Sequence, residues 1–99
     1  GNDEFFHPEV VAVNNFRKEM KGMKEDIRIS ENGETILVNR GDKGAALINL
    51  AIEENPVGLA TTLPDGEYTD TVYGQQFKVE GGLLTGTALP ETTYIIVRK

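Results

Sequence analysis

Few side chains in this sequence are of the kinds that act as general bases, nucleophiles or metal ligands. His7 is the single histidine, and the chain has no cysteine, so disulfides and thiolate metal sites are excluded. No second histidine and no convergent pair of carboxylates accompanies His7 in the sequence. Because Pro8 follows it directly, we interpret His7 as the residue that flanks the start of a helix.

Paired carboxylates hydrolyse glycosidic bonds, and they must lie about 5–10 Å apart to do so. Glu53 and Glu54 precede a turn and Asp65 is followed by Gly66, so these positions are typical of solvated loop charges. The Asp-x-Asp-x-Asp-Gly pattern of calcium loops is absent, and Asp65 and Asp70 are isolated in the sequence. We therefore expect no catalytic residue, no metal site and no cofactor in this chain.

Aromatic side chains offer a further possibility, because a pyranose ring can stack its apolar face on a flat aromatic platform. The chain has no tryptophan, and Tyr68, Tyr73 and Tyr94 are the candidate carbohydrate-binding residues. Tyr68 and Tyr73 fall in one predicted strand five residues apart, which places them on opposite faces unless a bulge or a cross-strand pair intervenes. Tyr94 would contribute if it were exposed, whereas Phe77 alternates with Val79 and is predicted to be core.

Length and charge limit the classes of function that the chain can serve. Its 99 residues correspond to one domain, large enough to fold around a single core. The formal net charge of −6 argues against nucleic acid, whose phosphates require clustered lysine and arginine. No apolar run approaches the roughly 20 residues of a membrane span, so we expect no membrane partner. The acidic start lacks the features of a signal peptide, and we expect the chain to be a piece of a longer protein.

The first predicted element is a helix over residues 8–21. Pro8 suits the first turn of a helix, and Gly22 is a suitable stop. The apolar residues recur at helical spacing and form one stripe, made of Val10, Val13, Phe16 and Met20 and widened by Val11. A single helix of this length is marginal in water, so its stripe must be buried against another surface.

Beyond this helix the apolar period shortens to about two, which is typical of strands. The predicted strands cover residues 26–30, 34–40, 44–51, 57–62, 67–73, 76–80, 83–84 with its flank, and 92–98. Short strands separated by turn signals indicate an all-β sandwich or barrel. The strongest turn signal is Asn32-Gly33, since both residues tolerate the positive φ of a two-residue hairpin.

A hairpin over residues 36–51 is predicted to lie at the centre of this β-structure. Its second arm is apolar on both faces, with Leu47 on one face and Ala46, Ile48 and Leu50 on the other. A strand that buries both faces must be covered from each side, so we place residues 44–51 in the middle of a sheet. The last strand is apolar on both faces too and is a second candidate for a central position.

The order of these segments is similar to that of a known enzyme family. Residues 9–17 resemble the last helix of the catalytic barrel in α-amylases, which are glycoside hydrolases with a (β/α)8 core. The rest of the chain resembles the C-terminal β-domain of these enzymes. The matching motifs are Arg40-Gly41-Asp42-Lys43-Gly44 followed by Leu47-Ile48-Asn49-Leu50, Thr61-Thr62-Leu63-Pro64-Asp65-Gly66-Glu67-Tyr68-Thr69-Asp70, Phe77-Lys78-Val79 with Gly81-Gly82, and Tyr94-Ile95-Ile96-Val97.

The resemblance implies an eight-stranded antiparallel Greek-key sandwich preceded by one helix. Residues 1–22 would be a remnant of the catalytic barrel, and residues 23–99 would form the C-terminal β-sandwich domain. The apolar stripe of the helix would face the barrel in the parent enzyme. In a separate chain that stripe would pack on the sandwich, mediate dimerisation or leave the helix frayed.

The resemblance also implies a function without catalysis in this chain. α-Amylases hydrolyse α-1,4-glucans with three carboxylates borne on barrel strands, and none of the surrounding motifs occurs here. The chain would support and stabilise the barrel, its expected partner, while calcium, which α-amylases often bind, would belong to the parent enzyme. A secreted parent would place the chain outside the cell or at its envelope. The alternatives are a weak α-glucan-binding module and a free-standing adhesion or scaffold domain.

Overall fold

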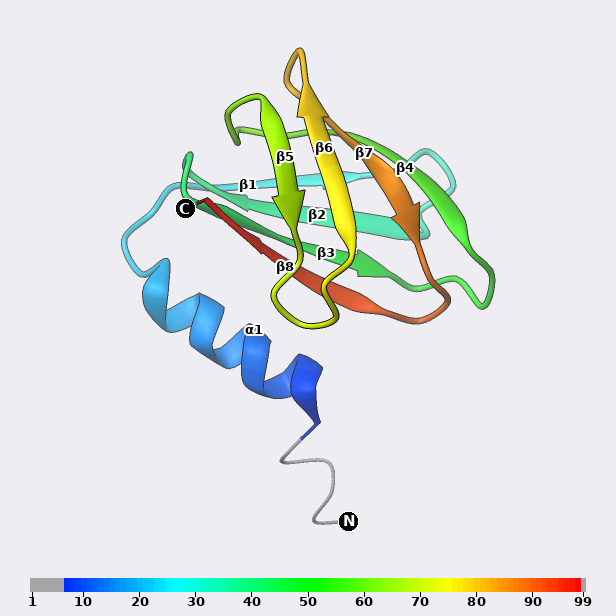
Figure 1. Cartoon of the computed structure of the whole chain (residues 1–99), viewed down its shortest axis with the longest axis horizontal. Helices are drawn as coiled ribbons and strands as arrows, with labels where there is room; N and C mark the ends of the chain where they lie inside the picture. The colour runs from blue at the N-terminus through cyan, green and yellow to red at the C-terminus, as the bar shows by residue number, and fades with distance from the viewer. Residues whose placement is uncertain (1–6, 99) are drawn as a thin grey trace.

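The described part of the chain, residues 7–98 of a computed structural model, forms two antiparallel four-stranded sheets packed face to face and one helix (Figure 1). The elements are α1 (Pro8–Glu19), β1 (Glu25–Ile29), β2 (Thr35–Arg40), β3 (Gly44–Asn49), β4 (Asn55–Ala60), β5 (Gly66–Thr69), β6 (Gln76–Glu80), β7 (Leu83–Ala88) and β8 (Thr93–Val97). The strand orders are β1-β2-β3-β8 and β4-β7-β6-β5. The second order is a Greek key, so the predicted all-β sandwich with an N-terminal helix is confirmed.

The core lies between the two sheets, where alternate residues of each strand point inward. In β2, Leu37 is fully buried while its neighbours Ile36 and Val38 are half-buried on the outer face. The buried core residues come from both sheets and the connections between them: Leu37, Ala45, Leu47, Val57, Leu59, Leu63, Phe77, Val79, Leu84, Ala88, Tyr94 and Ile96. This cluster lies within the described chain, so the sandwich has a core of its own.

β3 occupies the central position that its sequence predicts, between β2 and β8. Its inner face contributes Leu47 to the core, and Ala46 on its outer face is covered by α1. Leu50 does not belong to this buried face, because the strand ends at Asn49 and the Leu50 side chain is 58% exposed. The expectation that Leu50 is buried with Ala46 and Ile48 is therefore wrong.

β8, the second candidate for a central position, lies at the edge of its sheet. It is nevertheless buried, because the connection between β5 and β6 covers its free edge. The N–H of Thr71 donates to the carbonyl of Ile95 over 2.8 Å, and the N–H of Ile95 donates to Oδ1 of Asp70 over 2.7 Å. These two bonds replace the missing neighbouring strand.

The Asp70 carboxylate is buried, with 2% of the residue exposed, and all of its assigned hydrogen bonds come from backbone N–H groups. In addition to Ile95, it accepts from Val72 over 3.1 Å and from Tyr73 over 2.6 Å. Hydrogen bonds to an ionised acceptor are stronger than neutral ones, and they compensate for burying the charge. Asp70 therefore shapes the β5–β6 connection and holds it against β8.

α1 runs alongside β8 (Figure 1) and packs on the outer face of the first sheet, where its side chains reach Ala46 of β3. Phe16 and Met20 are buried against Ala46 and Ile95, and Val13 is partly buried beside them. Of the predicted stripe, Val10 and Val11 stay 46% and 43% exposed. The structure therefore shows the stripe packed on the sandwich over part of its width.

The close approach of α1 to the sheet requires a glycine in β3. A Cβ atom at Gly44 would lie 2.8 Å from the Phe16 ring and 3.1 Å from the carbonyl oxygen of Ile96. The end of the helix is also fixed there, because Nη2 of Arg40 donates to the carbonyl of Met20 over 3.0 Å. Gly44 thus permits the contact between the helix and the sheet.

The turn at Asn32-Gly33 differs from the predicted two-residue hairpin. Ser30 and Thr35 close a four-residue loop, and within it only Gly33 has a positive φ, of 75°. The Asn32 side chain instead accepts a hydrogen bond from the N–H of Glu34 over 3.0 Å. Asparagine can satisfy a loop through its side chain as well as through positive φ, which explains the difference.

Gly44→Ala should destabilise the chain by about 1–3 kcal/mol, because the added methyl group overpacks the contact between Phe16 and the sheet. Gly58→Ala is the matched control, since Gly58 lies in β4 with no atom within 4 Å of an added Cβ. Urea unfolding of both variants measures the difference. Equal stability of the two variants would contradict the proposed role of Gly44.

Asp70→Asn should lower the free energy of unfolding by about 1–3 kcal/mol, because one of two acceptor oxygens becomes a donor facing backbone N–H groups. Asp65→Asn is the control, since Asp65 is exposed and accepts a single N–H, from Gly81, over 3.2 Å. Hydrogen exchange at the Ile95 amide should rise in Asp70→Asn alone. Unchanged exchange at Ile95 would show that Asp70 does not secure β8.

Candidate functional site

Tyr94, one of the three candidate carbohydrate-binding residues, is fully buried in β8. Its hydroxyl oxygen accepts a hydrogen bond from the N–H of Leu89 over 2.9 Å. Its ring centroid lies 5.1 Å from that of Phe77, with the planes inclined by 68°. Tyr94 does not meet the condition of exposure under which it would contribute to a sugar site, because its ring fills the space between the sheets. Phe77 is core as predicted.

Tyr73 lies in the connection between β5 and β6, beyond the end of the strand that contains Tyr68. Its side chain is half exposed, and its ring meets that of Tyr94 edge to face with centroids 6.0 Å apart. Its hydroxyl donates to the carboxylate of Glu9 in the first turn of α1. Burial and this hydrogen bond to a carboxylate raise the pKa of Tyr73 to about 12. Tyr73 therefore joins the start of α1 to the sandwich.

Tyr68 lies in β5 and is partly buried against the core. Its hydroxyl donates to the carbonyl of Pro64 over 2.5 Å, and burial raises its pKa. The structure brings Tyr73 and Tyr94 into contact, but their planes are inclined by 79° and Tyr94 is covered. The tyrosines thus do not form the flat exposed platform that sugar stacking requires.

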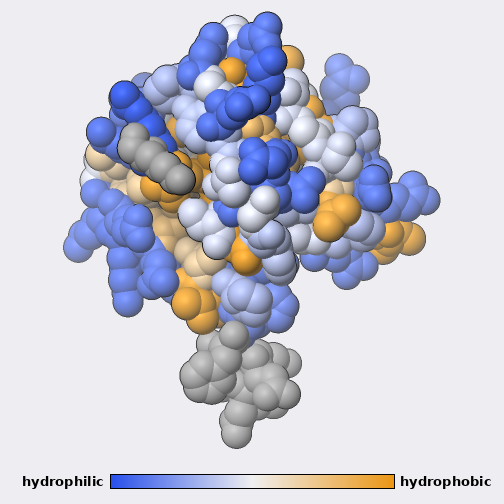
Figure 2. Space-filling model, in the orientation of Figure 1, coloured by the Kyte–Doolittle hydropathy of each residue, from blue (hydrophilic) through white to orange (hydrophobic). Residues whose placement is uncertain are grey.

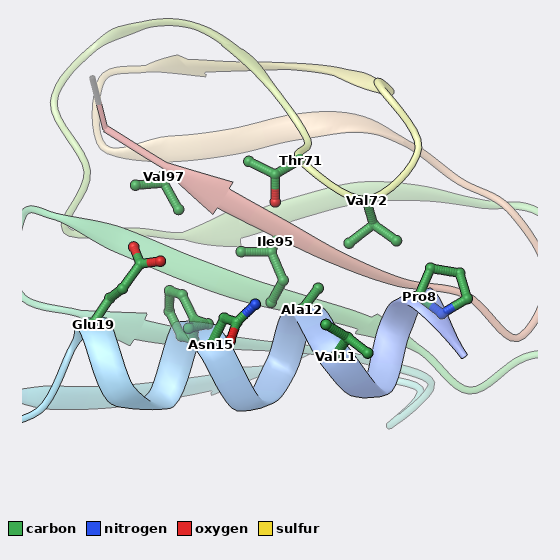
Figure 3. A pocket seen from close by; sticks show the side chains of 10 residues that line it. Pro8, Val11, Ala12, Asn15, Glu19, Thr71, Val72, Ile95 and Val97 are labelled. Atoms are coloured by element: carbon green, nitrogen blue, oxygen red, sulfur yellow. The ribbon is translucent and has the colours of Figure 1, made fainter. Parts of the chain in front are cut away.

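A groove of about 550 Å³ lies between α1 and β8 (Figure 3). The helix forms one wall, and β8 with the β5–β6 connection forms the other, so that Val11 and Ala12 lie opposite Val72 and Ile95. Elsewhere, the face in Figure 2 is largely hydrophilic, with separate apolar areas. The sequence did not predict this groove, because the groove depends on how the helix lies on the sheet. The one sequence feature that pointed to it was Val11, which widens the apolar stripe of the helix beyond the part that is buried.

None of the remaining candidate groups is among the residues that line this groove. His7 caps the helix, since its Nδ1 accepts the N–H of Glu9 over 3.1 Å. Glu53, Glu54 and Asp65 are exposed in loops, as their sequence context predicts. Among residues 7–98, no three His, Cys, Asp or Glu side chains gather in an arrangement that could hold a metal ion. In the same range no helix is long and apolar enough to cross a membrane.

Comparison with known proteins gives matches to one kind of enzyme. No protein-family model matches the chain. An α-amylase of Clostridium acetobutylicum is 33% identical over 94 residues, which are 92% of this chain and 12% of that enzyme. An α-amylase of Butyrivibrio fibrisolvens is 31% identical over 106 residues, which cover all of this chain and 11% of that enzyme.

A solved structure shares the fold. The α-amylase I of Eisenia fetida, determined in complex with maltohexaose, superposes with a TM-score of 0.77 over 97% of this chain and 23% of its own. The sequence identity in this superposition is 22%, so it supports the architecture alone. The chain spans 11–12% of the length of the sequence relatives it matches. This chain is thus similar in sequence to a small part of two α-amylases, and its fold matches a part of a third.

Proposed function

We propose that this chain is the non-catalytic C-terminal domain of an α-amylase-like enzyme that acts on α-1,4-glucans such as starch and maltooligosaccharides. Its role in that enzyme is to support and stabilise the catalytic barrel. The matches to α-amylases over 11–12% of their length support this assignment.

The observation that carries the proposal is that α1 has one side buried on the sandwich and apolar residues left exposed on its flanks. The inner side of the helix is fixed to the sandwich by Phe16 and Met20 near its end and by the Tyr73–Glu9 hydrogen bond near its start. Val10 and Val11 remain 46% and 43% exposed on its flanks. A helix held in this way presents apolar surface in a fixed orientation, which a neighbouring domain can bury.

Burial of such surface is stabilising for both partners. Covering an aliphatic side chain contributes about 1.5–3 kcal/mol when it passes from full exposure to full burial, and proportionately less from half exposure. The folded domain can contact the barrel only while the barrel is folded too. This contact therefore stabilises the folded barrel relative to the unfolded one. Catalysis, substrate cleavage and any calcium site are assigned in this proposal to the rest of the enzyme.

Glucan binding by this chain is the weaker alternative. Tyr94 is buried, and the Tyr73 hydroxyl is engaged with Glu9, so two of the three candidate tyrosines already have structural contacts. No geometric feature of the described residues favours a sugar site over the supporting role.

Removal of residues 23–99 from the parent enzyme should lower its thermal midpoint or its solubility, because apolar surface on the barrel and on α1 becomes exposed. The measurement is thermal unfolding of the truncated and complete enzymes, with activity per folded molecule measured at low temperature as a control. We expect cleavage to persist in the truncated enzyme while its stability falls. An unchanged thermal midpoint together with unchanged solubility would refute the supporting role.

Titration of the isolated chain with a maltooligosaccharide up to several millimolar should leave its amide NMR spectrum without a clustered, saturable shift. The residues to follow are Tyr68 and Tyr73, whose rings are the most accessible of the three tyrosines. Residues in β2, remote from both, serve as the internal reference. Saturable shifts confined to the surroundings of Tyr68 or Tyr73 would instead establish the domain as a glucan-binding module.

A further inference from the structure

The loop between β1 and β2 contains the one Asn-Gly pair of the sequence, Asn32-Gly33. The backbone nitrogen that follows an asparagine can attack the carbon of the side-chain amide, which closes a cyclic succinimide and releases ammonia. Glycine favours this attack because it has no Cβ to hinder the approach and its backbone is conformationally free. Both residues are exposed, so water reaches the amide and the nitrogen. The local sequence and the exposure therefore point to a reactive asparagine.

The other asparagines between residues 7 and 98 lie where this reaction is hindered. Two are inside α1, where the helix engages the N–H groups that follow them, and two are buried in β2 and β3. The last precedes a proline, whose nitrogen has no proton to lose. These asparagines are Asn14, Asn15, Asn39, Asn49 and Asn55. Asn32 is thus the asparagine of this range at which sequence, access and backbone all permit the reaction.

Hydrogen bonds within the loop polarise the Asn32 amide. Its Oδ1 accepts from the Ser30 hydroxyl over 2.7 Å and from the N–H of Glu34 over 3.0 Å, and its Nδ2 donates to Oε1 of Glu34 over 3.0 Å. These partners fix which end of the amide is which, because a backbone N–H only donates and a carboxylate only accepts. The Ser30 oxygen itself accepts the N–H of Thr35 over 3.0 Å, which leaves its proton for Oδ1.

Two donors on one carbonyl oxygen favour addition of a nucleophile to the amide carbon. They stabilise the negative charge that develops on Oδ1 during the addition, as the donors of an oxyanion hole do. The nucleophile is the backbone nitrogen of Gly33, which donates to the carbonyl of Ser30 over 2.9 Å. Because Gly33 lies outside both strands, this bond can open without breaking the pairing of β1 with β2.

We propose that Asn32 is a site of spontaneous deamidation in the folded chain, and that the Ser30 hydroxyl and the N–H of Glu34 assist the reaction. Hydroxide removes the proton of the Gly33 nitrogen, which then forms a bond to Cγ of Asn32. The bond between Cγ and Nδ2 breaks, and the leaving nitrogen takes a proton from water and departs as ammonia. Water then opens the succinimide to an aspartate or an isoaspartate at position 32. Residues 30–34 and water suffice, so this inference does not depend on the proposed function.

Either product disturbs the loop. A carboxylate replaces the Nδ2 group that donates to Glu34, so two negative charges face each other where the hydrogen bond was. Isoaspartate also lengthens the backbone by one carbon atom, inside a loop whose ends are joined by the N–H of Ser30 and the carbonyl of Thr35 over 2.9 Å. Deamidation would therefore loosen the start of β2 slowly and irreversibly.

Incubation of the chain at mildly alkaline pH, followed by tryptic digestion and mass spectrometry, tests the site. Cleavage after Arg28 and Arg40 gives the peptide of residues 29–40, which contains Asn32 together with the buried Asn39 as an internal control. We expect the mass of Asn32 to change from that of an amide to that of a carboxylic acid, in two chromatographic forms, while Asn39 stays intact. Chain digested without incubation gives the background of the procedure.

Two comparisons decide whether the folded loop assists the reaction. Ser30→Ala removes one donor from Oδ1 and should slow deamidation severalfold, whereas Ser30→Thr keeps a hydroxyl and should retain most of the rate. An equal or higher rate in Ser30→Ala, with unchanged circular dichroism, would overturn the assistance by Ser30. The second comparison is the chain unfolded in urea. If Asn32 reacts there but stays intact in the folded chain, the loop protects the asparagine and the proposal is wrong.

Discussion

Three buried polar side chains connect the two sheets of this domain by hydrogen bonds, and the surface on which α1 packs depends on the arrangement they favour. Asp70 accepts the N–H of Ile95 over 2.7 Å and so fixes the β5–β6 connection to the edge of β8. Asn39 and Asn49 donate across the sandwich to the carbonyls of Ala60 and Leu89, over 3.1 and 2.8 Å. Because an unpaired buried polar group is costly, these bonds strongly favour one arrangement of the sheets. β8 carries Ile95, on which α1 rests, so the orientation of the helix follows from the same bonds.

α1 is the link between this fold and its function. By sequence it resembles the last helix of a catalytic barrel, yet Phe16 and Met20 are buried against the sandwich, next to a glycine that allows close contact. Its flanks remain open, one toward the groove with β8 and the other toward a smaller hollow lined by Val38 and Ile48 of the sheet. The helix and the sandwich together therefore form one preassembled unit that presents apolar surface. Under the proposed function this surface is covered by the barrel, the domain contributes stability and orientation, and chemistry belongs to the rest of the enzyme.

The sequence predicts the elements well because their signals are local. Helical spacing, alternation along the strands and glycine turns locate the helix and each of the eight strands, although β5 ends four residues before the predicted end and β7 extends to Ala88. The errors concern contacts between distant segments. β8 is an edge strand that is buried by a loop, and Tyr94 is covered by Phe77 from the other sheet. Tyr73 was assigned to a strand, whereas Asp70 turns the chain before it. The groove beside α1 depends on the angle and distance of helix packing, which local patterns do not encode.

Coupling between this domain and the barrel is the central claim, and scanning calorimetry of the complete enzyme tests it most directly. The isolated chain, measured alone, gives the midpoint of the uncoupled domain. A shared apolar interface predicts one cooperative transition in which the domain unfolds together with the barrel, above the midpoint of the isolated chain. A separate transition of the domain at the midpoint of the isolated chain would contradict the account, because the barrel would then gain nothing from its contact.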